Sequence, residues 1–143
     1  MTALSITLEK LILRWAKLKI VIDLYGNVNL DVIKDKIFGL HDDVRHIIIA
    51  DFKGEVLSIF SRAKKEWPSD VQKQFSGLIA VLTIGLSEKV QDIAGHVEYV
   101  LVRYEKLNII IVKSLHFIYI ISTRKSMPNE VIDRLVGLIR QEG

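Results

Sequence analysis

The residues best suited to chemistry lie between positions 41 and 46. His41, Asp42 and Asp43 are followed closely by His46, and imidazole and carboxylate groups are common ligands of metal ions. The four residues span the end of one expected helix and the start of an expected strand, where polar side chains usually contact solvent. We interpret the cluster as a polar junction and expect no metal site.

Ser114 and His116 form a second candidate, because a serine becomes a nucleophile when a neighbouring base takes its proton. No carboxylate is evidently placed to orient this histidine, so the pair indicates a turn. The sequence also lacks G-x-x-x-x-G-K-[ST] and G-x-G-x-x-G, the loops that hold nucleotide phosphates. We therefore expect neither a catalytic centre nor a cofactor, and the protein is not itself a recognisable GTPase.

The densest group of basic residues follows position 61. Arg62, Lys64, Lys65 and Lys73 surround Trp67, and cations beside an aromatic ring can bind phosphates and stack a base. The alternative is a solvated loop in which the tryptophan packs at the start of a helix, and we favour it. Arg124 and Lys125 could extend the group if the fold brings them close. The net charge of +3 is small, so a nucleic-acid partner is not expected.

The composition is that of one globular domain. Of the 143 residues, 50% are hydrophobic and 26% are charged, and there is no cysteine. The longest uncharged apolar window, Phe75 to Ser87, is shorter than the roughly 20 residues that span a bilayer. The charged residues Glu9, Lys10 and Arg14 do not fit a signal peptide. We expect a cytoplasmic protein, and the many Ile, Lys and Glu residues fit a thermophilic source.

The first 28 residues form an expected extension to the domain at 29–143. Apolar residues recur at helical spacing from Leu4 to Leu18. The helix could continue to Gly26, or Lys19–Leu24 could form a short β segment, because β-branched residues cluster there. We favour the helix. The apolar positions of the first helix are Leu4, Leu8, Leu11, Ile12, Trp15 and Leu18.

Five strands and three further helices follow. Asn29 is a favourable N-cap for a helix over Leu30–Leu40. Val44–Ala50 and Glu55–Ser61 should pair through a tight turn, because Asp51 and Gly54 supply its chemistry. The remaining expected elements are a long helix from Ser69 to about Ile93, the strands Val97–Tyr104, Asn108–Lys113 and Phe117–Thr123, and a helix from Pro128 to Arg140.

The order and links of these elements predict the fold. The last three strands are separated by a few residues, which permits antiparallel neighbours but no parallel crossover. The strands are nearly continuous apolar blocks, so both faces of their sheet should be covered. We predict an α/β (α+β) fold: a three-layer α/β/α sandwich around a five-stranded antiparallel sheet, with the long helix on one face and the other two helices on the opposite face.

The long helix is apolar on two sides. One stripe of large side chains should lie on the sheet, and the opposite side is apolar as well until Glu88. A second copy of the chain or the amino-terminal helix must cover that opposite side, and we favour the second copy. The expected sheet-facing residues are Val71, Phe75, Leu78, Ile79, Leu82, Leu86 and Ile93, and the opposite residues include Gly77, Ala80, Val81, Ile84 and Gly85.

Several segments resemble the roadblock/dynein light-chain family. The run Val44–Leu57 looks like the opening hairpin of that family. Leu86–Val90 at the end of the long helix and Val97–Val102 after it resemble its centre, and the later strand pair resembles its end. The likeness covers residues 30 to 141 and consists of element order and apolar pattern, because the family has no short diagnostic motif. The amino-terminal extension and the tight turn at 114–116 depart from the family.

The resemblance implies a non-enzymatic module that dimerises through the long helix and the strand after it. Such dimers bind and regulate or scaffold Ras-like small GTPases, or serve as adaptors. The alternative function is a basic scaffold that contacts nucleic acid or an acidic membrane surface. The expected dimer interface comprises Gly77, Ala80, Val81, Ile84, Glu88, Val97, Tyr99 and Leu101. The expected partner-binding residues are Arg62, Lys64, Lys65, Lys73 and Gln74.

Overall fold

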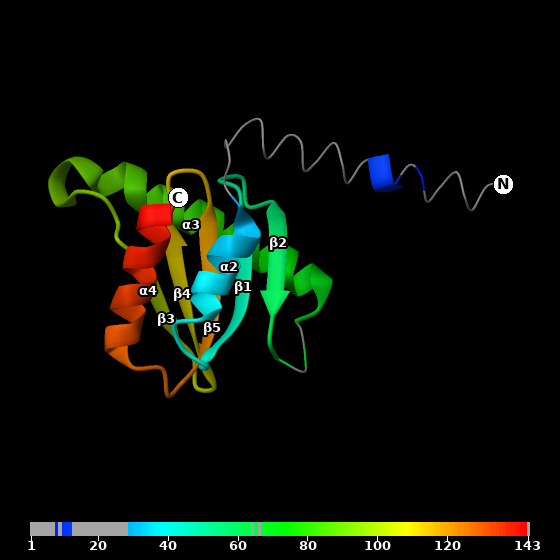
Figure 1. Ribbon diagram of the computed structural model, residues 1–143. Helices are drawn as coiled ribbons and strands as arrows, with labels where there is room; N and C mark the ends of the chain where they lie inside the picture. The colour runs from blue at the N-terminus through cyan, green and yellow to red at the C-terminus, as the bar shows by residue number, and fades with distance from the viewer. Residues whose placement is uncertain (1–7, 9, 13–28, 64, 66, 143) are drawn as a thin grey trace.

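The computed structural model describes residues 8, 10–12, 29–63, 65 and 67–142 of the chain, and Figure 1 shows their arrangement. The expected helical continuation beyond residue 12 lies outside these residues, so the division at residue 28 stays a prediction. The elements are α2 (Leu30–Phe38), β1 (Val44–Ala50), β2 (Val56–Ser61), α3 (Ser69–Ala94), β3 (Val100–Arg103), β4 (Leu107–Lys113), β5 (Ile118–Arg124) and α4 (Asn129–Glu142).

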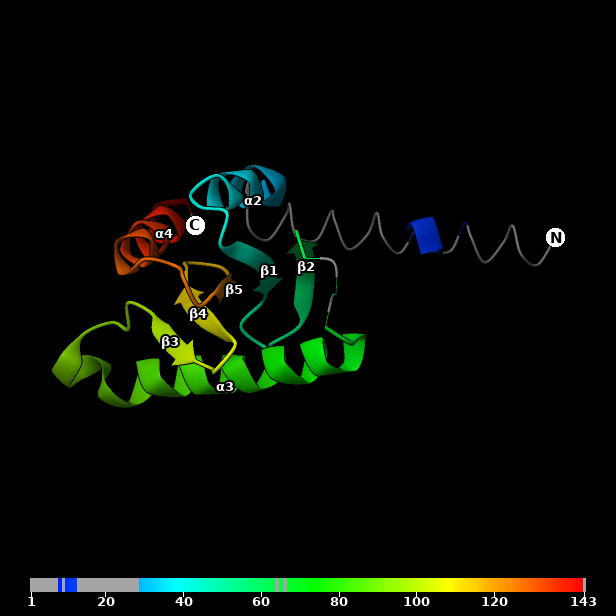
Figure 2. The same ribbon diagram turned by 90° about the horizontal axis from the view of Figure 1, so that it is seen from below.

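The five strands form one antiparallel sheet in the order β2-β1-β5-β4-β3. Helices α2 and α4 lie on one face, and α3 crosses the other face (Figure 2). This arrangement confirms the predicted three-layer sandwich. It leaves β2 and β3 at the two edges of the sheet.

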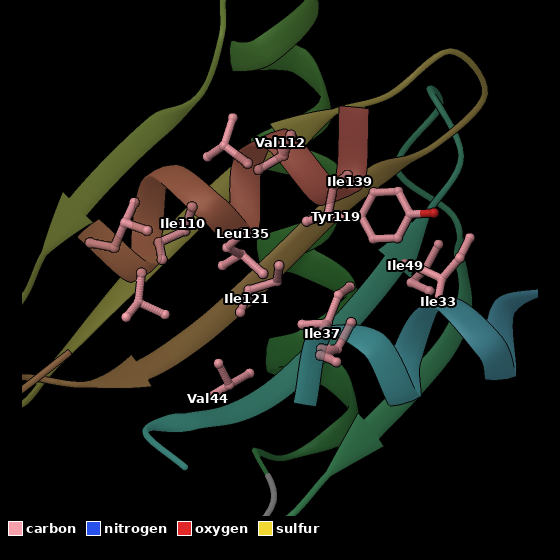
Figure 3. Packing of buried hydrophobic residues seen from close by; sticks show 14 of the residues in the cluster. Ile33, Ile37, Val44, Ile49, Ile110, Val112, Tyr119, Ile121, Leu135 and Ile139 are labelled. Carbon is pink, nitrogen blue, oxygen red and sulfur yellow. The ribbon is translucent and has the colours of Figure 1, made fainter. Parts of the chain in front are cut away.

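The core between the sheet and the α2/α4 layer is built mainly from isoleucine (Figure 3). Ile33 and Ile37 of α2 and Leu135 and Ile139 of α4 are at most 3% exposed, and they pack in one cluster with Tyr119 of β5. The sheet's opposite face forms a second cluster with α3. Because successive strand residues point to opposite faces, the apolar blocks of β4 and β5 supply both clusters.

Short side-chain contacts fix the ends of the elements. The Asn29 side chain accepts from the backbone N–H groups of Asp31 and Val32, which caps α2. Asp51 Oδ1 accepts from the N–H groups of two residues in the β1–β2 turn, each at 2.9 Å, as the turn chemistry predicts. Gly54 in this turn has φ +86°, a conformation that favours glycine.

Most predicted boundaries lie within one or two residues of those in the structure, and two of the differences have a local cause. The helix expected to reach Leu40 ends at Phe38, because Gly39 already forms its C-cap. The strand expected over Val97–Tyr104 is paired only at Val100–Arg103. The register of β3 with β4 would place residue 97 opposite Ser114, but the chain turns there, so no straight partner strand is available.

Candidate functional site

Helix α3 rests on the sheet mainly through small and polar residues, with Ile79 as the one large apolar side chain that is buried there. At Gly54, an added Cβ would lie 2.6 Å from Gly77 Cα and 3.1 Å from Ser76 O, so the β1–β2 turn approaches the helix backbone closely. Large side chains at the contact would prevent this approach. The buried residues of α3 are Gln72, Ser76, Ile79, Ala80 and Thr83.

The predicted sheet-facing stripe of α3 is therefore wrong for most of its members. Ile79 is buried and Phe75 is half-buried. The other five residues are exposed. Sequence reasoning assigned the largest side chains to the sheet, but the isoleucines of the strands already fill that layer. The exposed members of the predicted stripe are Val71, Leu78, Leu82, Leu86 and Ile93.

The outward face of α3 is consequently a row of large apolar side chains. Leu78 is 66% exposed and Val81 is 72% exposed. Added Cβ atoms at Gly77 and Gly85 would meet nothing within 4 Å, so the backbone on this side is open to close approach. Scattered apolar residues are normal on a protein surface, but a contiguous row marks an interaction site.

The predicted interface residues of α3 lie at different depths. Val81 and Glu88 are exposed, and Gly77 and Ile84 are half-buried. Ala80 is only 2% exposed and belongs to the cluster between α3 and the sheet. Ala80 therefore has almost no surface to offer a partner, and we leave it out of the proposed interface.

Strand β3 presents the second part of the predicted interface. Within the described residues it pairs with β4 alone and forms an edge of the sheet. Leu101 in this strand, together with Val97 and Tyr99 before it, is half-buried. Unpaired backbone groups along an edge strand are a template for another strand. The edge therefore adds backbone donors and acceptors beside the apolar face of α3.

The predicted partner-binding residues are not all free. The Arg62 guanidinium donates to Phe38 O, lies over the Phe38 ring at 4.3 Å from its centroid, and is 3.8 Å from Asp42 Oδ1. It ties the end of β2 to the end of α2. Lys65, Lys73 and Gln74 are exposed. Lys64 lies outside the described residues.

The residues considered above for metal binding or catalysis form hydrogen bonds within the fold. Ser126 Oγ donates to Asp43 Oδ2 at 2.8 Å, and Asp43 is 7% exposed, so the junction after α2 is more buried than predicted. His46 Nδ1 is 2.9 Å from Ser61 Oγ on the paired strand. Ser114 Oγ donates to Phe117 O and accepts from Phe117 N, which closes the predicted turn.

The described part of the chain presents neither a metal-ligand cluster nor a membrane-spanning helix. No group of three His, Cys, Asp or Glu residues there could hold a metal ion. None of the helices described is long and apolar enough to cross a membrane.

A groove beside the start of α3 was not predicted. It has a volume of about 670 Å³ and separates the first turns of α3 from the β3–β4 hairpin. Trp67 and Phe75 meet edge to face in it, with ring centroids 5.5 Å apart. Sequence reasoning placed the tryptophan at the helix start but had no signal for the hairpin opposite. The lining residues are Trp67, Pro68, Val71, Phe75, Tyr104, Glu105, Lys106 and Leu107.

Comparison with known proteins identifies the architecture. No family model matches the sequence, and no curated protein matches it. Among solved structures, MglB in a tetrameric arrangement superposes with a TM-score of 0.60 at 11% identity, covering 77% of this chain and 84% of that one. A Roadblock/LC7 domain from Streptomyces avermitilis superposes with a TM-score of 0.55 at 15% identity, over 80% of this chain and 98% of that one. The chain has the roadblock fold.

The gliding protein MglB from Thermus thermophilus has the same roadblock architecture. Its TM-score is 0.55 at 13% identity, covering 77% of this chain and 84% of that one. The likeness to the roadblock fold predicted from the sequence is thus confirmed at the level of structure. In that fold the present chain shows its apolar α3 face and its β3 edge on adjoining surfaces.

Proposed function

We propose that this roadblock protein is a homodimeric module without a catalytic centre, and that the dimer binds and regulates or scaffolds a Ras-like small GTPase. The observation that carries the proposal is the outward face of α3, where Leu78 and Val81 are 66% and 72% exposed. A protein that needs these side chains for its own core would bury them. Their exposure favours a contact with another protein chain.

A second copy of the chain fits this face well. A two-fold axis brings the same surface onto itself, so an apolar face meets an apolar face without any further partner. Gly77 and Gly85 leave room beside the large side chains, and their open surroundings allow a facing helix to approach closely. Strand β3 lies at the sheet edge and could pair with its own copy, which removes an exposed edge.

The basic side of this dimer is the surface that we assign to the GTPase. Lys65 and Lys73 are exposed around the start of α3, and Gln74 is exposed at the next position of the helix. Lys64 is adjacent in sequence. Arg62 already bonds within the chain, so we assign it to the fold and not to the partner. The class of partner comes from the resemblance to roadblock domains and is an argument by analogy.

Calorimetry with the full-length protein tests the proposal directly. Small GTPases of the source cell, loaded with GDP or with a non-hydrolysable GTP analogue, should bind, and one nucleotide state should bind more tightly. Light scattering on the same preparation should give the mass of two chains. Failure of every GTPase in both states would overturn the functional proposal. Steeply salt-dependent binding to nucleic acid or to acidic vesicles would instead favour the basic-scaffold alternative.

A further inference from the structure

A pocket lined by basic side chains lies at the end of the sheet where α3 and α4 finish, and it has a volume of about 280 Å³. Its three basic residues come from distant parts of the sequence: His96 follows α3, Lys113 ends β4, and Arg140 lies in the last turn of α4. Figure 1 shows these segments at the same end of the sheet. The remaining lining residues are Val97, Ser114 and Leu115. No carboxylate of the described residues lines this basic pocket.

The three basic side chains are not neutralised by acidic neighbours. None of them forms an ion pair with a carboxylate of the described residues. One turn before Arg140, where a helical acid partner would stand, the chain has Val136 and Gly137. The Lys113 ammonium lies over the Phe52 ring, 5.2 Å from its centroid, and this contact does not remove its positive charge.

The ends of α3 and α4 offset only part of this positive charge. A helix C-terminus carries about half a negative elementary charge, so the two ends together supply about one. Lys113 and Arg140 supply two positive charges, and His96 adds to them when it is protonated. The pocket therefore keeps an excess of positive charge. Like charges repel one another, and a bound anion would remove that repulsion.

We propose that the basic pocket binds a phosphate group, carried by a small phosphorylated molecule or by a lipid headgroup. The Arg140 guanidinium has the paired N–H donors that match phosphate oxygens, and the Lys113 ammonium adds a point charge. Pockets for drug-sized ligands have volumes of about 300–1,000 Å³, so a pocket of about 280 Å³ suits a compact anion. Lys65 and Lys73 do not line it, so the inference does not rest on the proposed GTPase contact.

A phosphate in the basic pocket would also hold the segment that precedes β3. Residues Val97–Tyr99 have no partner strand among the described residues, because β3 pairs with β4 only from Val100 onward. His96, directly before this segment, lines the same pocket as Lys113 and Arg140. A bound phosphate therefore links the unpaired segment to the ends of β4 and α4.

Calorimetry with the full-length protein and pyrophosphate tests the site. Arg140→Gln should weaken binding at least about tenfold, because it removes charge-assisted hydrogen bonds to the phosphate. Arg140 is exposed, so the fold should persist. Arg134→Gln is the matched control, because it removes the same charge from an exposed position of α4 outside the pocket, and it should leave the affinity nearly unchanged. Amide hydrogen exchange at Val97–Tyr99 should slow when pyrophosphate binds.

Vesicles of neutral lipid containing phosphatidic acid distinguish the two sources of phosphate. Leu115 in the β4–β5 turn is 76% exposed and lines the pocket, so it would enter the bilayer beside a lipid headgroup. A lipid source predicts retention on these vesicles that Arg140→Gln and Leu115→Ser both reduce. A soluble source predicts pyrophosphate binding that Arg140→Gln alone reduces, with no retention on vesicles.

Two results would overturn the proposal. One is the failure of both pyrophosphate and the vesicles to bind. The other is equal weakening by Arg140→Gln and Arg134→Gln, which would indicate attraction to the net charge and not to the basic pocket. Neither result affects the GTPase proposal, because that proposal concerns the start of α3 and is tested with different ligands.

Discussion

The two helical layers of this protein use apolar side chains in opposite ways. Helix α4 directs its large apolar residues inward, and Leu135 and Ile139 are fully buried. Helix α3 directs mostly small and polar residues inward, with Ile79 as the exception, and most of its large apolar residues outward: Ala80 is buried and Val81 is exposed. Both helices lie on a sheet of similar apolar strands. The difference shows that the α4 layer completes a core, whereas the α3 layer leaves a surface suited to another chain.

The contact of each layer with the sheet explains part of this contrast. The α2 and α4 helices reach the sheet through branched and aromatic neighbours such as Ile37 and Tyr119 (Figure 3). The β1–β2 turn touches α3 at the backbone of Gly77, where a Cβ on Gly54 would be only 2.6 Å away. At this point of closest approach there is no room for a leucine beneath the helix. Its leucines are therefore available for the opposite side.

The largest effect on stability should follow from shortening a buried side chain of α4. Leu135→Ala removes a fully buried side chain and should lower the free energy of unfolding by about 2–5 kcal/mol, because it leaves a cavity in the core. Leu78→Ala on α3 removes the same atoms from a side chain that is 66% exposed. Its cost should be below about 1 kcal/mol at protein concentrations where the chain is monomeric. Urea unfolding of both variants measures the difference. Equal losses of unfolding free energy would refute the contrast between α4 and α3.

The close approach of the β1–β2 turn gives the next largest effect. Gly54→Ala meets a positive φ of +86° and the backbone of Gly77, so we expect a loss of about 2–4 kcal/mol in unfolding free energy. Gly95→Ala is a matched control, because Gly95 has φ +81° and open surroundings. With ψ −167° it lies in a region that residues other than glycine rarely adopt, so Gly95→Ala should cost about 1–3 kcal/mol for the backbone conformation alone, and less than Gly54→Ala. Thermal or urea unfolding tests the pair, and similar losses would mean that the turn can move away from α3.

The sequence was sufficient to predict the architecture because its strands are short, apolar and closely linked. Links of a few residues between β3, β4 and β5 exclude parallel crossovers, and the turn at Asp51–Gly54 determines the first hairpin. The resemblance to roadblock domains added the same order of elements. Helix and strand ends were less predictable, because the end of β3 depends on where its partner strand turns away at Ser114.

The orientation of α3 could not be predicted in the same way. Periodicity showed that the helix is apolar on two sides, but it does not say which side meets the sheet. The contact between Gly54 and Gly77 determines which side of α3 meets the sheet. These two residues are distant in sequence, so periodicity within the helix does not reveal their contact. The groove between Trp67 and Tyr104 depends on the same tertiary arrangement. A glycine in a tight turn and the small residues Ser76 and Ala80 in the middle of α3 were the available signals.

The smallest effect should come from charges at the rim of the α3 layer. Lys65→Glu combined with Lys73→Glu reverses two exposed charges beside the start of α3. If the proposed GTPase is the partner, the double variant should slow association with it about tenfold at low salt, because rim charges mainly steer encounter. The dimer mass should not change. Arg134→Glu on the exposed side of α4 is the control and should leave the rate nearly unaltered. Stopped-flow or surface-plasmon measurements at several salt concentrations separate the two outcomes, since the loss should shrink as salt screens the charges. An equal slowing by Arg134→Glu would place the partner on the α2/α4 layer instead of the α3 layer.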